Sequence, residues 1–211
     1  MKDLIIIGVG GVGREAALIA EEINEQSQEW NILGFVDDNE DVQNTYINGY
    51  PVLGKSQYLQ NYKDEVYVFC GISNYKVKKK IISKLKENQN IKFATLIHPS
   101  VKLNKHIKIG EGCIIYQNVI MTVNIEIGNH VIISPKCGIG HDSKIHDYVT
   151  LLWNVNVSGN VDIKEGATMG SGSTVIQGLT IGEGSFVGAG ACVIRDVEDN
   201  KTAVGVPTRY V

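Results

Sequence analysis

The stretch "IGEGCIIYQNVIMTVNIEIG", residues 109–128, carries an aliphatic residue or methionine at every sixth position. The same register continues far beyond it in both directions. Its seventeen positions hold only Ile, Leu, Val or Met: Ile97, Leu103, Ile109, Ile115, Met121, Ile127, Ile133, Ile139, Ile145, Leu151, Val157, Ile163, Met169, Val175, Ile181, Val187 and Val193. A period of six is too long for strand alternation and too short for a helix pair, so it favours a three-sided coil with these residues inside.

Three faces of six residues make a coil of 18 residues, so residues 97–196 predict five to six stacked coils. Four residues after each aliphatic position stands a small or apolar residue, such as Cys113 or Ala167. We therefore expect a prism of short parallel strands, spaced by about 4.8 Å and joined by turns.

Residues 1–96 have a different texture, in which strand-like runs alternate with helix-like runs. The pattern predicts four strands and three helices, with a turn at 50–54: strands near 4–7, 32–36, 65–72 and 91–96, and helices near 14–26, 55–62 and 74–89. This alternation indicates a parallel sheet covered by helices. We predict an α/β Rossmann-like domain over residues 1–96 and a parallel β-helix domain over residues 97–211.

The segment "LIIIGVGGVGREAA", residues 4–17, contains Gly8-x-Gly10-x-x-Gly13 between a strand and a helix. Such glycines allow a tight turn in which a phosphate sits on the amides of a helix N-terminus. With four predicted strands, only half of a dinucleotide site is available. A nucleoside diphosphate attached to another group therefore fits better than NAD, and glycines that merely pack helix against strand are the plain alternative.

Composition excludes several classes. The chain of 211 residues is 43% hydrophobic and 20% charged, as in ordinary soluble proteins. A formal charge of −3 leaves no basic footprint for nucleic acid, and no apolar stretch is long enough to span a membrane. The N-terminus lacks the regions of a signal peptide, so we expect a cytoplasmic protein. The four cysteines, Cys70, Cys113, Cys137 and Cys192, show no metal or disulfide spacing and are expected to be small buried side chains.

Six segments together, "GVGGVGR", "FVDD", "FCGISNYKVKKKI", "LIHPSV", "GIGHDSKIHDYV" and "AVGVPTRYV", span almost the whole chain. In this combination the chain resembles the bacterial hexapeptide-repeat sugar acetyltransferases. These include the N-acetyltransferases of UDP-, dTDP- and GDP-linked 4-amino sugars, and the sialic acid O-acetyltransferases are cousins. The resemblance implies a left-handed β-helix, a homotrimer, acetyl-CoA as co-substrate and a nucleotide-linked amino sugar as acceptor.

The same resemblance places the general base on His141 of "GHD", with Asp142 increasing its basicity. An amine that attacks a thioester must lose a proton, and histidine suits that task near neutral pH. His141 stands at the third, outward-facing place of its hexapeptide, and the position one coil later is Gly159. We expect this glycine to leave room for the substrate. No cysteine looks activated, so direct transfer is favoured over a covalent route.

The resemblance also implies binding residues. For the nucleotide sugar these are Gly10, Gly11, Val12, Asp37, Asp38 and Gly71; for acetyl-CoA they are Thr150, Ser171 and Ala189. Val12 and Thr150 stand where the family often has histidine, which leaves sugar recognition at Val12 open. Thr150 can still donate a hydrogen bond to a thioester carbonyl.

Three other functions compete with N-acetylation of a 4-amino-4,6-dideoxy sugar. The first is sugar O-acetylation, and the second is nucleotide-sugar binding without catalysis. The third is a zinc enzyme of the γ-carbonic-anhydrase type, because His146 follows His141 by five residues. A third ligand would then be needed near Lys105, where His106 is one place out of register, so we expect no metal.

Overall fold

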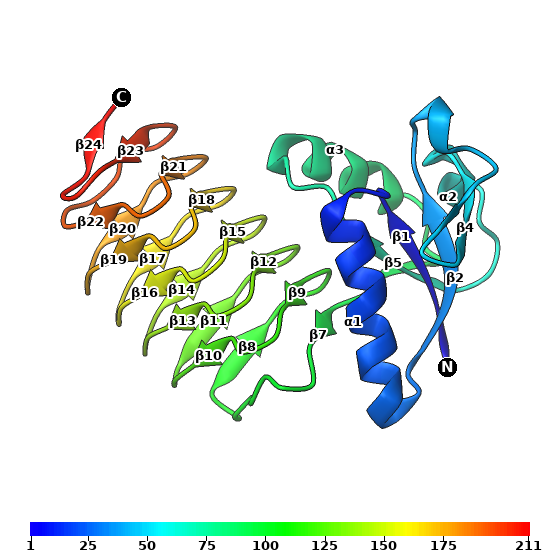
Figure 1. Cartoon of the computed structure of the whole chain (residues 1–211), viewed down its shortest axis with the longest axis horizontal. Helices are drawn as coiled ribbons and strands as arrows, with labels where there is room; N and C mark the ends of the chain where they lie inside the picture. Colours follow the sequence, from blue (N-terminus) through cyan, green and yellow to red (C-terminus); the bar gives the residue numbers. More distant parts are fainter. The chain divides into compact units, whose positions relative to one another are not determined.

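The computed structural model describes residues 1–211, and the chain divides into an N-terminal unit, Met1–His98, and a prism, Pro99–Val211 (Figure 1). The elements of the N-terminal unit are β1 (Lys2–Ile7), α1 (Gly11–Ser27), β2 (Trp30–Val36), the 3-10 turn η1 (Glu40–Val42), β3 (Tyr46–Ile47), β4 (Tyr50–Gly54), α2 (Gln57–Gln60), β5 (Val66–Cys70), α3 (Tyr75–Leu85), β6 (Ile91–Phe93) and β7 (Leu96–Ile97).

The sheet of the N-terminal unit runs β3-β4-β2-β1-β5-β6, with every pairing parallel except β3 with β4. The central strand β1 is continuously apolar, and Leu4, Ile5 and Ile6 are completely buried, as in a sheet covered on both faces. The chain leaves β1 toward β2 and later returns to β5 on the other side. The carboxyl ends of β1, β2 and β5 therefore border the crevice where ligands bind open α/β sheets.

The sheet has six strands, so the prediction of four strands was wrong. Residues 50–54, expected to form a turn, are β4, which pairs with β3 through a two-residue hairpin at Asn48 and Gly49. Both hairpin residues have positive φ, +50° and +88°, which is the Asn-Gly geometry favoured in tight hairpins. The proline at position 51 is tolerated near the edge of the sheet.

The prism confirms the 18-residue coil, because residues 18 apart face each other throughout, as Ile114, Ile132 and Thr150 do. Three sheets form its sides. The first is β10-β13-β16-β19-β22, the second is β8-β11-β14-β17-β20, and the third contains β9-β12-β15-β18-β21-β23-β24. Their strands are β8 (Ile107–Ile109), β9 (Ile114–Ile115), β10 (Ile120–Met121), β11 (Ile125–Ile127), β12 (Ile132–Ile133), β13 (Gly138–Ile139), β14 (Lys144–Ile145), β15 (Thr150–Leu151), β16 (Asn156–Val157), β17 (Asp162–Ile163), β18 (Thr168–Met169), β19 (Thr174–Val175), β20 (Thr180–Ile181), β21 (Phe186–Val187), β22 (Cys192–Val193), β23 (Thr202–Val204) and β24 (Arg209–Tyr210).

The predicted inward register is confirmed over most of its length. All fourteen positions from Ile115 to Val193 are buried. The start of the series differs: Leu103 is 48% exposed, and Ile97 and Ile109 are half-buried. The first regular coil begins only at β8, so these residues lack a complete layer on one side.

Each corner of the prism turns through a residue with left-handed backbone. Positive φ recurs every six residues from Gly112 to Gly190, and the corner positions hold glycine, asparagine or another residue with φ near +60°. Asparagine and aspartate tolerate this conformation better than most residues. Corner geometry thus explains the glycine and asparagine spacing of the repeats.

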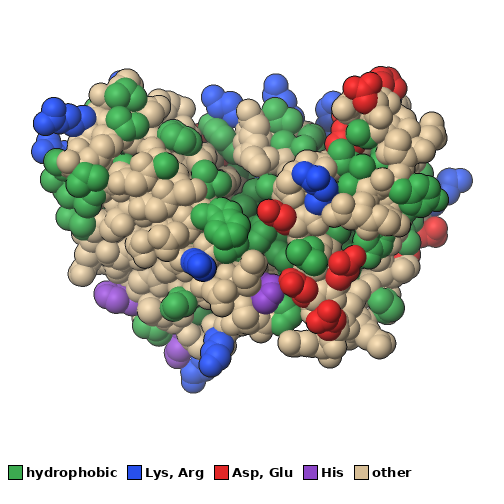
Figure 2. Space-filling view, viewed as in Figure 1, with side chains coloured by type: hydrophobic (Ala, Val, Ile, Leu, Met, Phe, Trp, Pro, Cys, Tyr) green, Lys and Arg blue, Asp and Glu red, His purple; other side chains and the backbone are tan.

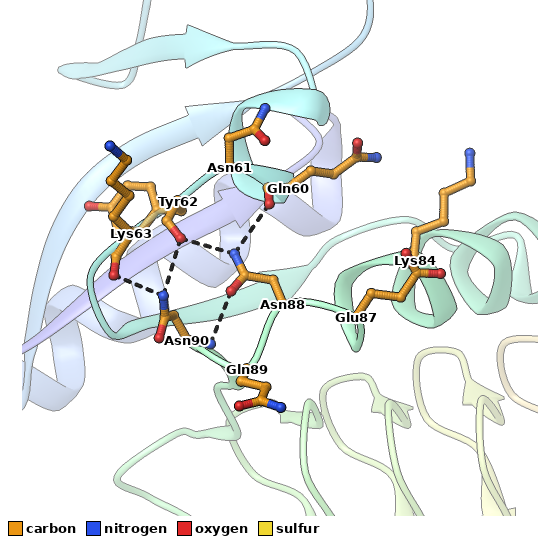
Figure 3. A pocket seen from close by; sticks show the side chains of 9 residues that line it. All are labelled: Gln60, Asn61, Tyr62, Lys63, Lys84, Glu87, Asn88, Gln89 and Asn90. Carbon is orange, nitrogen blue, oxygen red and sulfur yellow. Dashed lines mark hydrogen bonds between the residues drawn. The ribbon is translucent and has the colours of Figure 1, made fainter.

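No helix of the chain combines the length and the apolar character needed to cross a membrane. The largest hollow of the N-terminal unit, about 720 Å³, lies between the loops before β5 and before β6 (Figure 3). Within it, Asn88 Nδ2 donates to the carbonyls of Leu59 and Tyr62 at 3.1 and 3.0 Å, and Asn90 Nδ2 donates to Lys63 O at 2.8 Å. These amides clasp two loops together at the amino edge of the sheet, opposite the glycine turn.

We predict that Asn88→Ala lowers the free energy of unfolding by about 1–2 kcal/mol, because two loop carbonyls lose their donor. Gln89→Ala is the matched control, since Gln89 is exposed and its side chain makes no hydrogen bond. Chemical denaturation of both variants measures the difference. Equal stabilities would show that the clasp contributes nothing.

Candidate active site

The glycine turn between β1 and α1 contains glycines of two kinds. Gly8 has φ +91°, and a Cβ at Gly13 would lie 1.8 Å from Gly8 O, so the fold requires both residues. Gly10 and Gly11 are exposed, and a Cβ on either would meet nothing within 4 Å. Packing therefore explains Gly8 and Gly13 but not Gly10 and Gly11. No side chain caps the N-terminus of α1, which leaves its first amides open toward a ligand.

The two aspartates after β2 are both engaged within the chain. Asp37 accepts from the backbone amides of Val9 and Asn39, each at 2.9 Å. Asp38 accepts from the amide and hydroxyl of Ser56 at 2.8 and 3.0 Å. Asp37 thus ties the end of β2 to the glycine turn, whereas Asp38 holds the segment that precedes α2. Each carboxylate oxygen keeps a second lone pair for a ligand.

Gly71 ends β5 beside the same turn, and a Cβ there would lie 2.8 Å from Gly13 N. The structure therefore brings the glycine turn, Asp37 and Gly71 together at the carboxyl ends of three neighbouring strands. Val12 lies half-buried in the first turn of α1. Its apolar side chain contributes no hydrogen bond to this group.

His141 stands at the prism corner between the first and second sheets, between β13 and β14. Its Nδ1 lies 2.8 Å from Asp142 Oδ2, and the two side chains are 51% and 48% exposed. Asp142 occupies the left-handed corner position with φ +60°, which turns its carboxylate back along the corner. The imidazole is thus both oriented by a carboxylate and accessible to a substrate.

Asp142 also accepts from Asn124 Nδ2, one coil earlier, at 2.9 Å. This hydrogen bond, together with the one to His141, holds the pKa of the Asp142 carboxyl below its ordinary value. The carboxylate therefore remains ionised throughout the neutral range. An ionised Asp142 can only accept from Nδ1, which leaves the lone pair of the neutral ring on Nε2.

Gly159 lies against the imidazole, so its expected role needs correction. A Cβ at this position would stand 2.5 Å from His141 Nε2 and 2.6 Å from Cε1. The space made by the missing side chain is occupied by the ring, and it is not room for a substrate. Gly159 is thus the seat of the imidazole, and counting one coil onward in the sequence located it correctly.

The three residues expected at acetyl-CoA lie elsewhere on the prism. Thr150 is buried on β15 in the third sheet, across the prism from the His141 corner. Ser171 and Ala189 are exposed in successive coils of the corner between the third and first sheets. The structure stacks Ser171 and Ala189 but does not bring them or Thr150 to His141 within one chain.

The other histidines have partners or positions of their own. His98 Nε2 lies 3.2 Å from Glu22, and His106 is exposed. His130 is buried and stacks on Tyr148, with ring centroids 5.3 Å apart. His146 Nε2 lies 2.8 Å from Asp162 Oδ1. No three histidine, cysteine, aspartate or glutamate side chains are grouped as a metal site.

Three cysteines are buried as expected, but Cys192 is only partly buried because it points outward from the first sheet. Burial raises the pKa of Cys137 to about 11 and also raises the pKa of Cys70. Neither thiol is therefore activated as a nucleophile.

Sequence analysis missed a hollow of about 370 Å³ at the C-terminal end of the prism. Arg195 and Arg209 line it together with Tyr210, and neither arginine forms an ion pair within the chain. Arg195 occupies the same corner column as His141, three coils later. Counting in steps of 18 residues would have found this relation.

Comparison with known proteins now adds to this geometry. The PglD N-terminal domain family matches residues 3–85. Perosamine N-acetyltransferase from Caulobacter crescentus, solved as a histidine-to-asparagine variant with CoA and GDP-perosamine, superposes with a TM-score of 0.89 and 26% identity. That match covers 100% of this chain and 97% of the other. The acetyltransferase domain of PglB from Neisseria gonorrhoeae, solved with acetyl coenzyme A, gives 0.90 and 26%, with 100% and 99% covered.

Curated relatives match over shorter segments. An acyl-[acyl-carrier-protein]–UDP-N-acetylglucosamine O-acyltransferase from Rickettsia bellii is 34% identical over 64 residues, which is 30% of this chain and 23% of that protein. The chain thus matches about a quarter of the length of this curated relative. The full-length structural matches confirm the predicted left-handed parallel β-helix behind a Rossmann-like domain. This chain belongs to the hexapeptide-repeat sugar acetyltransferase family, with a PglD N-terminal domain preceding its repeats.

Proposed function

We propose that this protein is an enzyme that transfers an acetyl group from acetyl-CoA to the amine of a nucleotide-linked 4-amino-4,6-dideoxy sugar. One observation carries the proposal: a half-exposed imidazole with a carboxylate 2.8 Å from its Nδ1 on a hexapeptide-repeat prism. The substrate class is supported by the relatives, one of which was solved with CoA and GDP-perosamine and another with acetyl coenzyme A.

The proposed reaction is a direct attack. The sugar amine attacks the thioester carbonyl while Nε2 of His141 takes the proton that the amine must lose. Asp142 stabilises the resulting imidazolium through Nδ1. Collapse of the tetrahedral intermediate breaks the C–S bond, and the imidazolium returns its proton to the leaving thiolate of CoA. The products are the acetamido sugar and free CoA thiol.

The corner column of His141 also offers a path for CoA. Arg195 lies three coils beyond His141, which corresponds to roughly 14 Å at the strand spacing of a sheet. That separation suits the pantetheine arm, with the thioester at His141 and phosphate at Arg195 or Arg209. Arginine without a carboxylate partner is well suited to bind phosphate.

We propose a homotrimer, because the carried-over acetyl-CoA residues lie on two edges of the first sheet. His141 is on one edge, whereas Ser171 and Ala189 are on the other. Neighbouring copies that contribute opposite edges would assemble one site. Large hydrophobic side chains reach the surface of the prism (Figure 2), and those at least 40% exposed are Leu103, Ile120, Trp153, Ile176, Phe186, Ile194, Val206, Tyr210 and Val211. Such exposed apolar surface is typical of association surfaces.

In the N-terminal unit, the open amides at Gly10 and Gly11 are proposed to hold the diphosphate of the nucleotide sugar. Asp37 and Asp38 would face the nucleoside, Val12 would line the sugar turn without a hydrogen bond, and Gly71 would border the nucleotide. A cytoplasmic location is proposed because nucleotide sugars and acetyl-CoA are cytoplasmic metabolites.

The proposal is tested by incubating the protein with acetyl-CoA and UDP-, dTDP- or GDP-linked 4-amino sugars while free thiol is followed. Thiol release with one amino sugar, together with an acetamido product by mass spectrometry, is the expected result. Transfer to a hydroxyl would favour O-acetylation, for which the partial match to an O-acyltransferase speaks. Tight sugar binding without thiol release would indicate a binding protein, and stoichiometric zinc would indicate the metalloenzyme.

We predict that His141→Ala lowers kcat by about 10²–10⁴-fold, because the amine proton loses its acceptor. The exposed His106, in the neighbouring corner column two coils earlier, supplies the control His106→Ala, which should keep full activity. Steady-state kinetics on both variants checks this. An active His141→Ala variant would exclude the proposed base.

A second prediction concerns the seat of the imidazole. Gly159→Ala forces the ring to move, since its new Cβ would stand within 2.9 Å of three ring atoms, and we expect kcat to fall about 100-fold. Gly138→Ala is the control, because its Cβ would meet nothing closer than 3.7 Å. Both variants should unfold near the wild-type temperature. Equal activity of the two would contradict the proposed seat.

A third prediction concerns the glycine turn. Gly11→Ala has space for its Cβ and should not destabilise the fold, but it brings a methyl group to the proposed diphosphate site. We expect KM for the nucleotide sugar to rise about tenfold while KM for acetyl-CoA stays unchanged. If both KM values stayed unchanged, the glycine turn would not be the diphosphate site.

A further inference from the structure

The corner that holds His141 contains a second asparagine–aspartate contact whose role goes beyond corner geometry. Asn124 and Asp142 occupy the same column in successive coils, with φ of +55° and +60°. Asn124 Nδ2 donates to Asp142 Oδ1 at 2.9 Å, and Asp142 Oδ2 lies 2.8 Å from His141 Nδ1. Each carboxylate oxygen thus has one fixed partner.

The left-handed backbone alone does not account for this contact. Asn118, Asn154 and Asn160 also stand at prism corners, with φ of +60°, +57° and +61°. Their side chains make no hydrogen bond within the chain. Only Asn124, among the asparagines at these corners, is bonded to the carboxylate that faces the imidazole.

We propose that Asn124 is a positioning residue for the acetyl transfer: its amide fixes the Asp142 carboxylate so that Oδ2 stays directed at His141 Nδ1 and the reactive lone pair stays on Nε2. This inference rests on the proposed function. An exposed aspartate would otherwise rotate about its Cβ–Cγ bond, and either oxygen could then turn to water.

Few other charges bear on this corner. The coils directly before and after contribute Val123, Asn124, Gly159 and Asn160 to the two columns, none of which titrates. Lys105 and His106 lie two coils earlier, and Arg195 and Asp196 lie three coils later. Asn124 is therefore the nearest polar group able to act on Asp142 apart from His141. Its hydrogen bond is the largest cause that lowers the pKa of the Asp142 carboxyl.

The test compares Asn124→Leu with Asn118→Leu, which carries the same backbone strain at a corner without the contact. We expect Asn124→Leu to lower kcat about tenfold with KM for acetyl-CoA unchanged, whereas Asn118→Leu stays within about twofold of wild type. Asn124→Asp places a second carboxylate beside Asp142 and should lower kcat at least as much as Asn124→Leu. Equal losses in the two leucine variants would reduce Asn124 to a strained corner residue.

Two spectroscopic measurements test the inference without catalysis. Carbon-13 NMR of the Asp142 carboxyl should show its titration midpoint rising in Asn124→Leu and rising further in Asn124→Asp. Nitrogen-15 shifts of His141 should show the Nδ1–H form in wild type and a larger Nε2–H fraction in Asn124→Leu. Unchanged spectra in Asn124→Leu would overturn the inference even if the wild type acetylates the sugar. Conversely, a wild type that releases no thiol would refute the proposed function while the spectra still judged Asn124.

Discussion

The prism depends on one backbone constraint, the left-handed residue at every corner. Because a positive φ recurs at intervals of six, each side has the same length and each coil closes after 18 residues. Every side chain then stands directly above the side chain 18 positions earlier. The aliphatic interior follows from this closure, since residues of the same register must share the narrow space inside three sheets.

The candidate site inherits its geometry from the same constraint. It is built vertically, from an amide in one coil, the carboxylate and imidazole of the next, and a bare backbone in the third. No loop is needed to bring these groups together, because strand pairing already fixes their spacing. A site held on paired strands loses little conformational entropy when a substrate binds.

Sequence alone could predict whatever the period of six encodes. The buried register, the coil length and the outward position of His141 all follow from counting. Contacts between side chains were beyond it: the glycine at position 159 was found, but whether substrate or imidazole fills the space depends on a rotamer. Likewise, the four-strand prediction failed because short edge strands carry a weak signal, although the Asn48-Gly49 pair could have revealed the hairpin.

The last two strands bear on how large an assembly this prism can form. A stack of parallel coils exposes unpaired amides and carbonyls at its end, where a second stack could continue the ladder. Here β24 turns back and pairs antiparallel with β23, so the third sheet ends in a two-residue strand of opposite direction. A neighbouring prism can no longer extend that sheet in parallel register. The columns are thus kept from joining end to end into fibres, and their sides remain the surfaces through which they meet.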